Sequence, residues 1–138
     1  MDRRLVDQIK RHEGFRRAAY QDHLGYWTIG YGRMIDARKR GGITEDEAEV
    51  LLMADLERIE AAIDDWLPAN EARRAVIIGM GYQLGISGLL RFRRMLDAIR
   101  REDWAAAAAE GLDSAWAQQT PARAKELMRQ LETGEWSR

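Results

Sequence analysis

Residues 20–32 read YQDHLGYWTIGYG, and this stretch decides the architecture of the first part of the chain. Aromatic and β-branched residues, which favour strands, are interspersed here with glycines that permit tight turns. The pattern extends over residues 15–35 and predicts a small antiparallel sheet. Apolar residues at helical spacing precede it. We expect that first helix to end near Gly14, because glycine adopts the left-handed conformation that closes helices.

The segment after the sheet predicts one long helix. Thr44-Glu45-Asp46-Glu47 has the form of a capping box, in which Thr44 accepts from a free amide and Glu47 reaches back. Apolar residues then keep a helical period as far as Leu67, and Pro68 is expected to end the helix. Such a helix would connect a small N-terminal lobe to a helical C-terminal lobe.

The rest of the chain is predicted to be helical. Residues 71–84 are almost all apolar after Arg74, which indicates a buried helix, and we expect Gly79 and Gly81 to permit close packing there. Gly85 and Gly88 bracket an expected turn. Thr120-Pro121 predicts an N-cap with proline in the first helical position. We expect helices near 89–100 and 103–112 and from Pro121 to about Glu132, with Gly134 following the last.

The sequence therefore predicts an α+β, mostly α protein that forms a single domain over residues 1–138. Its lobes are expected to be a small β lobe at 13–43, a connecting helix at 44–67, and a helical lobe made of 1–12 with 68–138. We expect four of the five tryptophans to belong to the core: Trp66, Trp104, Trp116 and Trp136.

Composition narrows the class of function. Of 138 residues, 46% are apolar and 33% charged, and the net charge of −1 disfavours a strongly basic nucleic-acid binder. Cysteine is absent, which removes thiolate chemistry, and His12 and His23 are too few for a histidine-rich zinc site. No phosphate-binding loop occurs, and no residue set requires a metal or cofactor. An enzyme of this composition would use carboxylates as its acid and base.

Neither a membrane span nor a secretory signal is predicted. No apolar run approaches the roughly 18 residues that a span needs. The first seven residues lack the apolar stretch of a signal peptide. We therefore expect no stable membrane insertion and no export by the usual secretory route.

Glu13, Asp22 and Thr28 are the candidate catalytic residues. Glu13 ends the predicted helix, Asp22 lies in the first turn region of the sheet, and Thr28 lies inside the glycine-rich hairpin. A helix end and a hairpin folded over it can face one cleft. Glycoside hydrolysis requires two carboxyl groups there, one protonated to donate to the leaving oxygen and one ionised to activate water or attack carbon. Taken alone, this spacing also fits ordinary surface charges.

Four motifs in the same order give the chain a resemblance to the T-even bacteriophage lysozyme family, the phage muramidases. The first joins Glu13-Gly14 to Tyr20-Gln21-Asp22 and to residues 25–32, and the second is Ile43-Thr44-Glu45-Asp46-Glu47-Ala48-Glu49. The third is Tyr82-Gln83-Leu84-Gly85, and the fourth runs from Trp116 through residues 119–125 to residues 133–136. Together they extend over nearly the whole chain.

The resemblance implies a two-lobed lysozyme-like fold and hydrolysis of the β-1,4 bond between N-acetylmuramic acid and N-acetylglucosamine in peptidoglycan. It assigns the general acid to Glu13 and gives Asp22 and Thr28 the attacking water, with inversion at the anomeric carbon. It places Met34, Tyr82 and Gln83 along the saccharide cleft, and Arg123 where it would orient Glu13. Tyr82 could equally be a core aromatic residue at the lobe junction, whereas for Arg123 the functional placement is favoured over a surface position on its helix.

The sequence departs from the family at Arg33, where the family's usual residue is histidine. We expect Arg33 to pair with Asp55 on the long helix. The resemblance further implies a monomer that has bacterial peptidoglycan as its partner and no nucleic acid. It also implies an endolysin held in the host cytoplasm before release and acting on the wall in the periplasm or outside the cell.

Three other interpretations of the sequence stay open. The chain could be a catalytically silent scaffold or wall-binding module of the same fold, although Glu13, Asp22 and Thr28 argue against it. It could be a lysozyme domain of a larger assembly protein, such as a phage tail component. Lytic transglycosylase activity fits less well, because it would leave Asp22 and Thr28 without roles.

Overall fold

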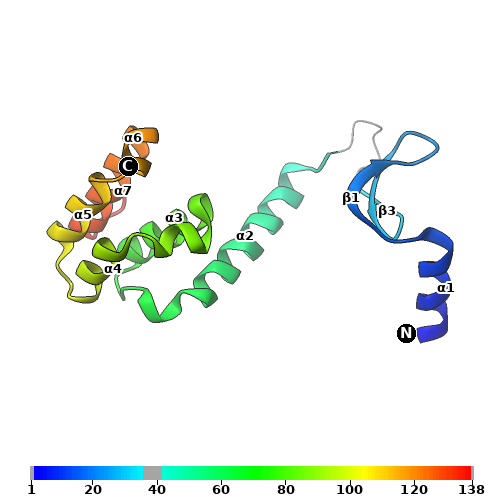
Figure 1. The fold of residues 1–138 in the computed structure, drawn as a ribbon, viewed down its shortest axis with the longest axis horizontal. Helices are drawn as coiled ribbons and strands as arrows, with labels where there is room; N and C mark the ends of the chain where they lie inside the picture. Colours follow the sequence, from blue (N-terminus) through cyan, green and yellow to red (C-terminus); the bar gives the residue numbers. More distant parts are fainter. Residues whose placement is uncertain (1, 36–41, 138) are drawn as a thin grey trace. The chain divides into compact units, whose positions relative to one another are not determined.

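The structure, a computed structural model, describes residues 2–35 and 42–137. The chain divides into two compact units, residues 1–51 and residues 52–138, and each is described by itself. Figure 1 shows the elements of both units in chain order. The predicted class is confirmed: the chain is mostly helical with a small N-terminal antiparallel sheet. The division into two lobes and a connecting helix stays a prediction.

The first unit begins with helix α1, Arg3–Glu13. The Asp2 carboxylate accepts a hydrogen bond from the Arg4 amide at 2.9 Å and caps the helix. The helix ends at Glu13, as predicted, because Gly14 takes a positive φ of 71°. Its ψ of 150° turns the chain into an extended direction rather than into the left-handed helical conformation.

A three-stranded antiparallel sheet in the order β1-β2-β3 follows α1. Its strands are β1 (Arg16–Gln21), β2 (Trp27–Gly30) and β3 (Arg33–Met34). Thr28 lies at the centre, paired with Tyr20 on one side and with Met34 on the other. The sheet therefore brings the middle of the glycine-rich hairpin between both neighbouring strands.

Helix α2, Glu45–Ala62, starts with the predicted capping box. The Glu47 amide donates to the Thr44 hydroxyl at 3.2 Å, and that hydroxyl donates to the Glu47 carboxylate at 3.1 Å. The predicted end at Leu67 is wrong. Ile63 leaves helical geometry, a 3₁₀ turn η1 (Asp64–Trp66) follows, and Leu67 is extended, as a residue before proline prefers.

The second unit is helical. Its helices are α3 (Glu71–Leu90), α4 (Arg93–Arg100), α5 (Trp104–Leu112), α6 (Ala115–Gln119) and α7 (Pro121–Thr133). α5 packs on α4 and α7, and α3 and α6 also pack on α7. Among the residues that the structure describes, the largest fully buried side chains all lie in this unit: Ile63, Val76, Ile77, Met80, Leu89, Met95, Met128 and Leu131.

Two glycines allow close helix packing in the second unit. A side chain on Gly81 would meet Ile59 at 2.9 Å, and one on Gly111 of α5 would collide with Met128 of α7. The prediction of close packing is therefore confirmed for Gly81. It is wrong for Gly79, where a Cβ atom would meet nothing within 4 Å. Gly85, with φ of 76°, bends α3 where a turn was predicted.

The structure differs from the prediction at α6 and at the start of α7. Helix α6 was not predicted, because five residues are too few to show a helical period. Thr120 precedes α7 but does not cap it with its side chain. Its hydroxyl donates instead to the Trp116 carbonyl at 3.0 Å. Pro121 does occupy the first turn, as predicted.

Arg73 of α3 ties the end of α7 to α3 and α5. Its guanidinium donates to the carbonyl oxygens of Leu131 at 2.7 Å and Glu132 at 2.8 Å. The same group lies 4.2 Å from the centroid of the Trp104 ring. α7 ends at Thr133, one residue beyond the predicted end, and Gly134, which follows the helix as predicted, is left-handed. These carbonyls are among those that a helix end leaves without intrahelical partners.

Tryptophan burial follows the prediction in part. Trp116 is buried, and Trp66 and Trp104 pack partly buried against the core. The core assignment is wrong for Trp136, which is 61% exposed. In the described segments, no single helix is long and apolar enough to cross a membrane; α3 and α4 satisfy that test only jointly, with a bend of 102° between them.

Candidate active site

Asp22 and Thr28 are joined through the backbone of one residue, Tyr26. Asp22 Oδ1 accepts hydrogen bonds from the amides of Leu24 and Tyr26, both at 2.9 Å. The Asp22 amide donates to the Tyr26 carbonyl at 2.8 Å, and the Thr28 hydroxyl donates to the same carbonyl at 2.9 Å. The turn between β1 and β2 therefore fixes both side chains relative to one peptide segment.

Burial separates these two groups. Thr28 is only 4% exposed, while Asp22 is partly buried. The sequence supports this local fold, because an aspartate that accepts from amides two and four residues later stabilises a tight turn. Gly25, with φ of 88°, completes the turn, and its amide donates to the Asp22 carbonyl at 3.0 Å.

Glu13 is the last residue of α1, in the first unit. Glu13 is exposed, and its carboxyl group lies against Gly32, a residue of the turn between β2 and β3. Tyr31 attaches this turn to α1. The centroid of its ring lies 5.5 Å from the centroid of the Phe15 ring and 5.2 Å from Lys10 Nζ, which belongs to α1.

Met34 follows the same turn on β3 and is exposed. It lines an apolar pocket of about 500 Å³ in the first unit, together with Ile29, Ile43 and Leu51. The first unit thus carries Glu13, Asp22, Thr28 and Met34, and Met34 pairs with Thr28 across two strands.

The remaining predicted site residues belong to the second unit. Tyr82 on α3 is 48% exposed, and both its place along a saccharide cleft and the alternative of a core aromatic residue at the lobe junction stay predictions. Gln83 accepts a hydrogen bond from Trp116 Nε1 at 3.0 Å, a contact that the sequence analysis did not predict. Arg123 is exposed in the first turn of α7, and its predicted contact with Glu13 stays a prediction.

Asp55 has a partner within its own helix. The Arg58 guanidinium, one turn further along α2, donates to Asp55 Oδ1. The predicted pair between Arg33 and Asp55 stays a prediction.

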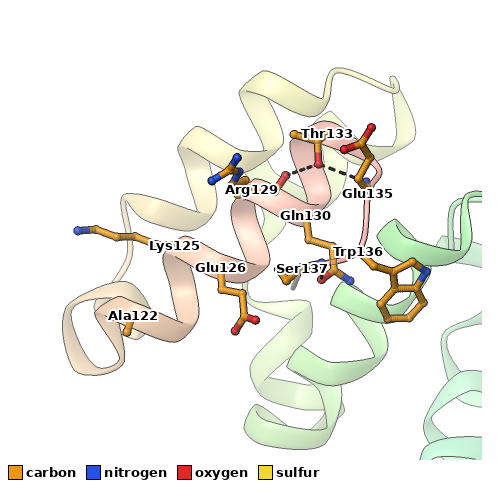
Figure 2. A pocket seen from close by; sticks show the side chains of 9 residues that line it. All are labelled: Ala122, Lys125, Glu126, Arg129, Gln130, Thr133, Glu135, Trp136 and Ser137. Carbon is orange, nitrogen blue, oxygen red and sulfur yellow. Dashed lines mark hydrogen bonds between the residues drawn. The ribbon is translucent and has the colours of Figure 1, made fainter.

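Figure 2 shows a pocket of about 730 Å³ along α7 and the residues after it. None of the predicted site residues lines it. Two of its polar side chains are bonded within the protein: Thr133 donates to the Arg129 carbonyl, and Gln130 donates to the Ala72 carbonyl at 2.8 Å.

The first unit carries two carboxyl groups, the pair that glycoside hydrolysis uses, together with the Thr28 hydroxyl that the turn fixes. The protein class that these features define is the glycoside hydrolases. The family model for phage lysozyme matches residues 10–133, which is most of the chain. The chain belongs to the phage lysozyme family, whose members are peptidoglycan hydrolases.

Individual relatives agree with this assignment. The chain is 30% identical to the pre-baseplate central spike protein Gp5 of Enterobacteria phage T4, over 94% of its own length and 28% of the spike protein. It is 29% identical to the probable T4-type lysozyme 1 of Dictyostelium discoideum, over 94% of both chains. It is also 29% identical to the endolysin of Acyrthosiphon pisum secondary endosymbiont phage 1, over 74% of this chain and 70% of the endolysin.

Proposed function

We propose that the chain is a muramidase that cleaves the β-1,4 bond between N-acetylmuramic acid and N-acetylglucosamine, with inversion of the anomeric carbon. The observation that carries this proposal is the turn that joins Asp22 to Thr28 through Tyr26. It fixes a carboxylate and a hydroxyl in the unit whose first helix ends at a second carboxyl group, Glu13.

Glu13 serves as the general acid. Its protonated carboxyl group donates to the glycosidic oxygen as the bond between that oxygen and the anomeric carbon breaks. Its exposed position at a helix end supports this role, because the group must reach a polymer that approaches from solvent. Removing the proton donor leaves an alkoxide as leaving group, which raises the barrier.

Asp22 and Thr28 serve the attacking water. Two backbone amides donate hydrogen bonds to Asp22 Oδ1. We assign Oδ2 to the water: this oxygen takes a proton from the water as the water oxygen attacks the anomeric carbon. The Thr28 hydroxyl donates its hydrogen to Tyr26, so its oxygen lone pairs are directed to accept from the same water. One turnover leaves Glu13 ionised and Asp22 protonated, and exchange with solvent restores both.

The test is digestion of purified peptidoglycan, with the products identified by mass. The wild type is compared with Glu13→Gln, in which an amide of similar shape replaces the acid. We expect reducing muropeptides from the wild type and a loss of roughly 10²–10⁴-fold in rate from the variant. Products with an anhydro end would indicate a transglycosylase, and binding without any product would indicate a silent scaffold. A retained configuration in the first product, observed by NMR, would contradict inversion.

We propose that the protein accumulates in the host cytoplasm and reaches the wall once the membrane is breached. The similarity to a spike protein over 28% of that protein's length favours a second candidate, a lysozyme domain within a larger phage assembly. Immunoblotting of lysate and purified virions distinguishes them. Signal in the soluble lysate at about 15.9 kDa supports the endolysin, and signal in virions at a larger mass supports the assembly.

A further inference from the structure

Gly32 lies where a side chain would occupy the position of the Glu13 carboxyl group. An ideal Cβ atom on Gly32 would lie 2.5 Å from Glu13 Oε2, 2.9 Å from its Cδ and 3.3 Å from its Cγ. Three successive atoms of Glu13 are thus in reach, so the carboxyl end of the side chain lies over the backbone of Gly32. Nonbonded atoms at optimal separation lie about 3.5–4.0 Å apart.

This relationship is not shared by the other glycines of the hairpin. Gly25, Gly30 and Gly32 all have positive φ angles, of 88°, 67° and 76°. A Cβ atom on Gly25 or Gly30 would meet nothing within 4 Å. Backbone conformation therefore explains glycine at all three positions, whereas only Gly32 also leaves room for the candidate acid.

The neighbouring residue holds the turn in place beside α1. The Tyr31 ring contacts Phe15 and lies beside Lys10 Nζ on α1, one turn before Glu13. The turn at 31–32 therefore approaches the chain on both sides of Glu13, through the aromatic contact with Phe15, which follows α1, and through Lys10 in α1. With that contact present, the backbone of Gly32 forms one wall against which the Glu13 carboxyl group rests.

We propose that Gly32 is a positioning residue for Glu13. Because Gly32 has no side chain, the Glu13 carboxyl group can occupy the space beside it, and the backbone of Gly32 limits where that carboxyl group can point. This inference rests on the proposed function, in which Glu13 is the acid. A methyl group at position 32 would displace the flexible end of Glu13 more readily than the backbone. The proton donor would then be misplaced relative to the leaving oxygen.

The experiment compares Gly32→Ala with Gly30→Ala in the full chain. Both variants put a Cβ atom on a residue with positive φ, so both are expected to lose similar stability in urea unfolding. Gly32→Ala alone is expected to lose roughly 10–10²-fold in kcat with KM nearly unchanged. Equal losses of kcat in both variants would overturn the proposal, because strain in the turn would then explain them.

Two further variants guard against unfolding and test the contact itself. Asparagine tolerates positive φ better than alanine, so Gly32→Asn and Gly30→Asn repeat the comparison at lower strain. Shortening the acid by Glu13→Asp is expected to cost less activity in the Gly32→Ala background than in the wild type. A larger or equal cost would contradict a steric conflict between the two positions.

A readout that does not depend on activity separates this inference from the proposed function. The ¹³C signal of the Glu13 side-chain carboxyl, assigned by its loss in Glu13→Gln, is expected to move in Gly32→Ala and to stay in Gly30→Ala. An unmoved signal in Gly32→Ala overturns the inference even when the wild type digests peptidoglycan. A wild type without hydrolysis refutes the proposed function, while the signal still decides whether Gly32 positions Glu13.

Discussion

The indole N–H of Trp116 donates a hydrogen bond to the side-chain oxygen of Gln83 at 3.0 Å. The bond links α6 to α3 at a tryptophan that is only 4% exposed and packs edge-on against Phe92. Because a buried indole N–H needs an acceptor, Gln83 serves the core as well as the surface.

A double-mutant cycle is expected to detect this bond. Trp116→Phe removes the donor, and Gln83→Met removes the acceptor at similar volume. Each single variant should lower the free energy of unfolding, and the coupling between them should be about 0.5–1.5 kcal/mol in urea unfolding. Strictly additive effects would show that the bond contributes nothing.

The hydroxyl of Thr28 is expected to matter more for activity than for stability. Thr28→Val keeps the volume of this buried residue but removes the donor to the Tyr26 carbonyl, which still accepts from the Asp22 amide. We expect a loss of about 1 kcal/mol in unfolding free energy, and of roughly 10²-fold or more in muramidase rate. Thr28→Ser keeps the hydroxyl and should retain most activity. Full activity in Thr28→Val would exclude Thr28 from handling the water.

We expect substitution to separate the structural task of Asp22 from its proposed catalytic task. Asp22→Asn retains an oxygen that can accept from the Leu24 and Tyr26 amides. The free energy of unfolding should therefore change by about 0.5 kcal/mol at most. The rate should nevertheless fall roughly 10²–10⁴-fold, because the neutral amide takes no proton from water. Asp22→Ala should lose stability as well, by about 1–3 kcal/mol. An active Asp22→Asn variant would contradict the base assignment.

Arg73 is expected to hold the last turn of α7. Arg73→Lys keeps the charge but loses the planar group that bonds two carbonyl oxygens and lies over Trp104. The free energy of unfolding should fall by about 1–3 kcal/mol. Amide hydrogen exchange in the last turn of α7 should become faster. Arg129→Lys, an exposed position on the same helix, is the matched control. Unchanged exchange in Arg73→Lys would refute this role.

The Arg74 ion pairs are expected to stabilise the protein equally at pH 6 and pH 9. The hydrogen bond that Arg74 donates to Asp64, followed by the interactions with Glu60, raises the pKa of Arg74 above its ordinary value. A raised arginine pKa contributes stability that is lost only as pH rises through that high value. Asp64 and Glu60 are exposed, so Arg74→Gln should cost only about 0.2–1 kcal/mol and less at high salt. Thermal melts at both pH values test this, with Arg94→Gln as the control for loss of a surface charge. A difference in melting temperature between the wild type and Arg74→Gln that is smaller at pH 9 than at pH 6 would contradict this prediction.

The local part of the fold could be predicted from the sequence. The end of α1 at Glu13 and the hairpin around Thr28 follow from glycine positions and from the alternation of residue types over short stretches. The capping box at Thr44 and the stop at Gly134 are equally local signals. These features depend on contacts within a few residues, which a pattern in the sequence can specify.

Features that depend on competition or on distant contacts could not be predicted. Thr120 can cap α7 or bond the Trp116 carbonyl, and the residue type fits both. The apolar character of Trp136 does not specify that its ring lies beyond the helix end and remains exposed. The room that Gly32 leaves for Glu13 arises where a turn meets a helix end nineteen positions earlier, and no local pattern signals it.

The division of the chain also determines how it can be observed optically. Trp27 in β2 is the single indole of the first unit, and the other four of the sequence belong to the second. Replacing Trp27 with phenylalanine would leave an emission signal from the helical unit alone, and the difference spectrum would belong to the sheet. Melting of the two halves can thus be followed in one cuvette without an added dye, which shows whether they lose structure together or in sequence.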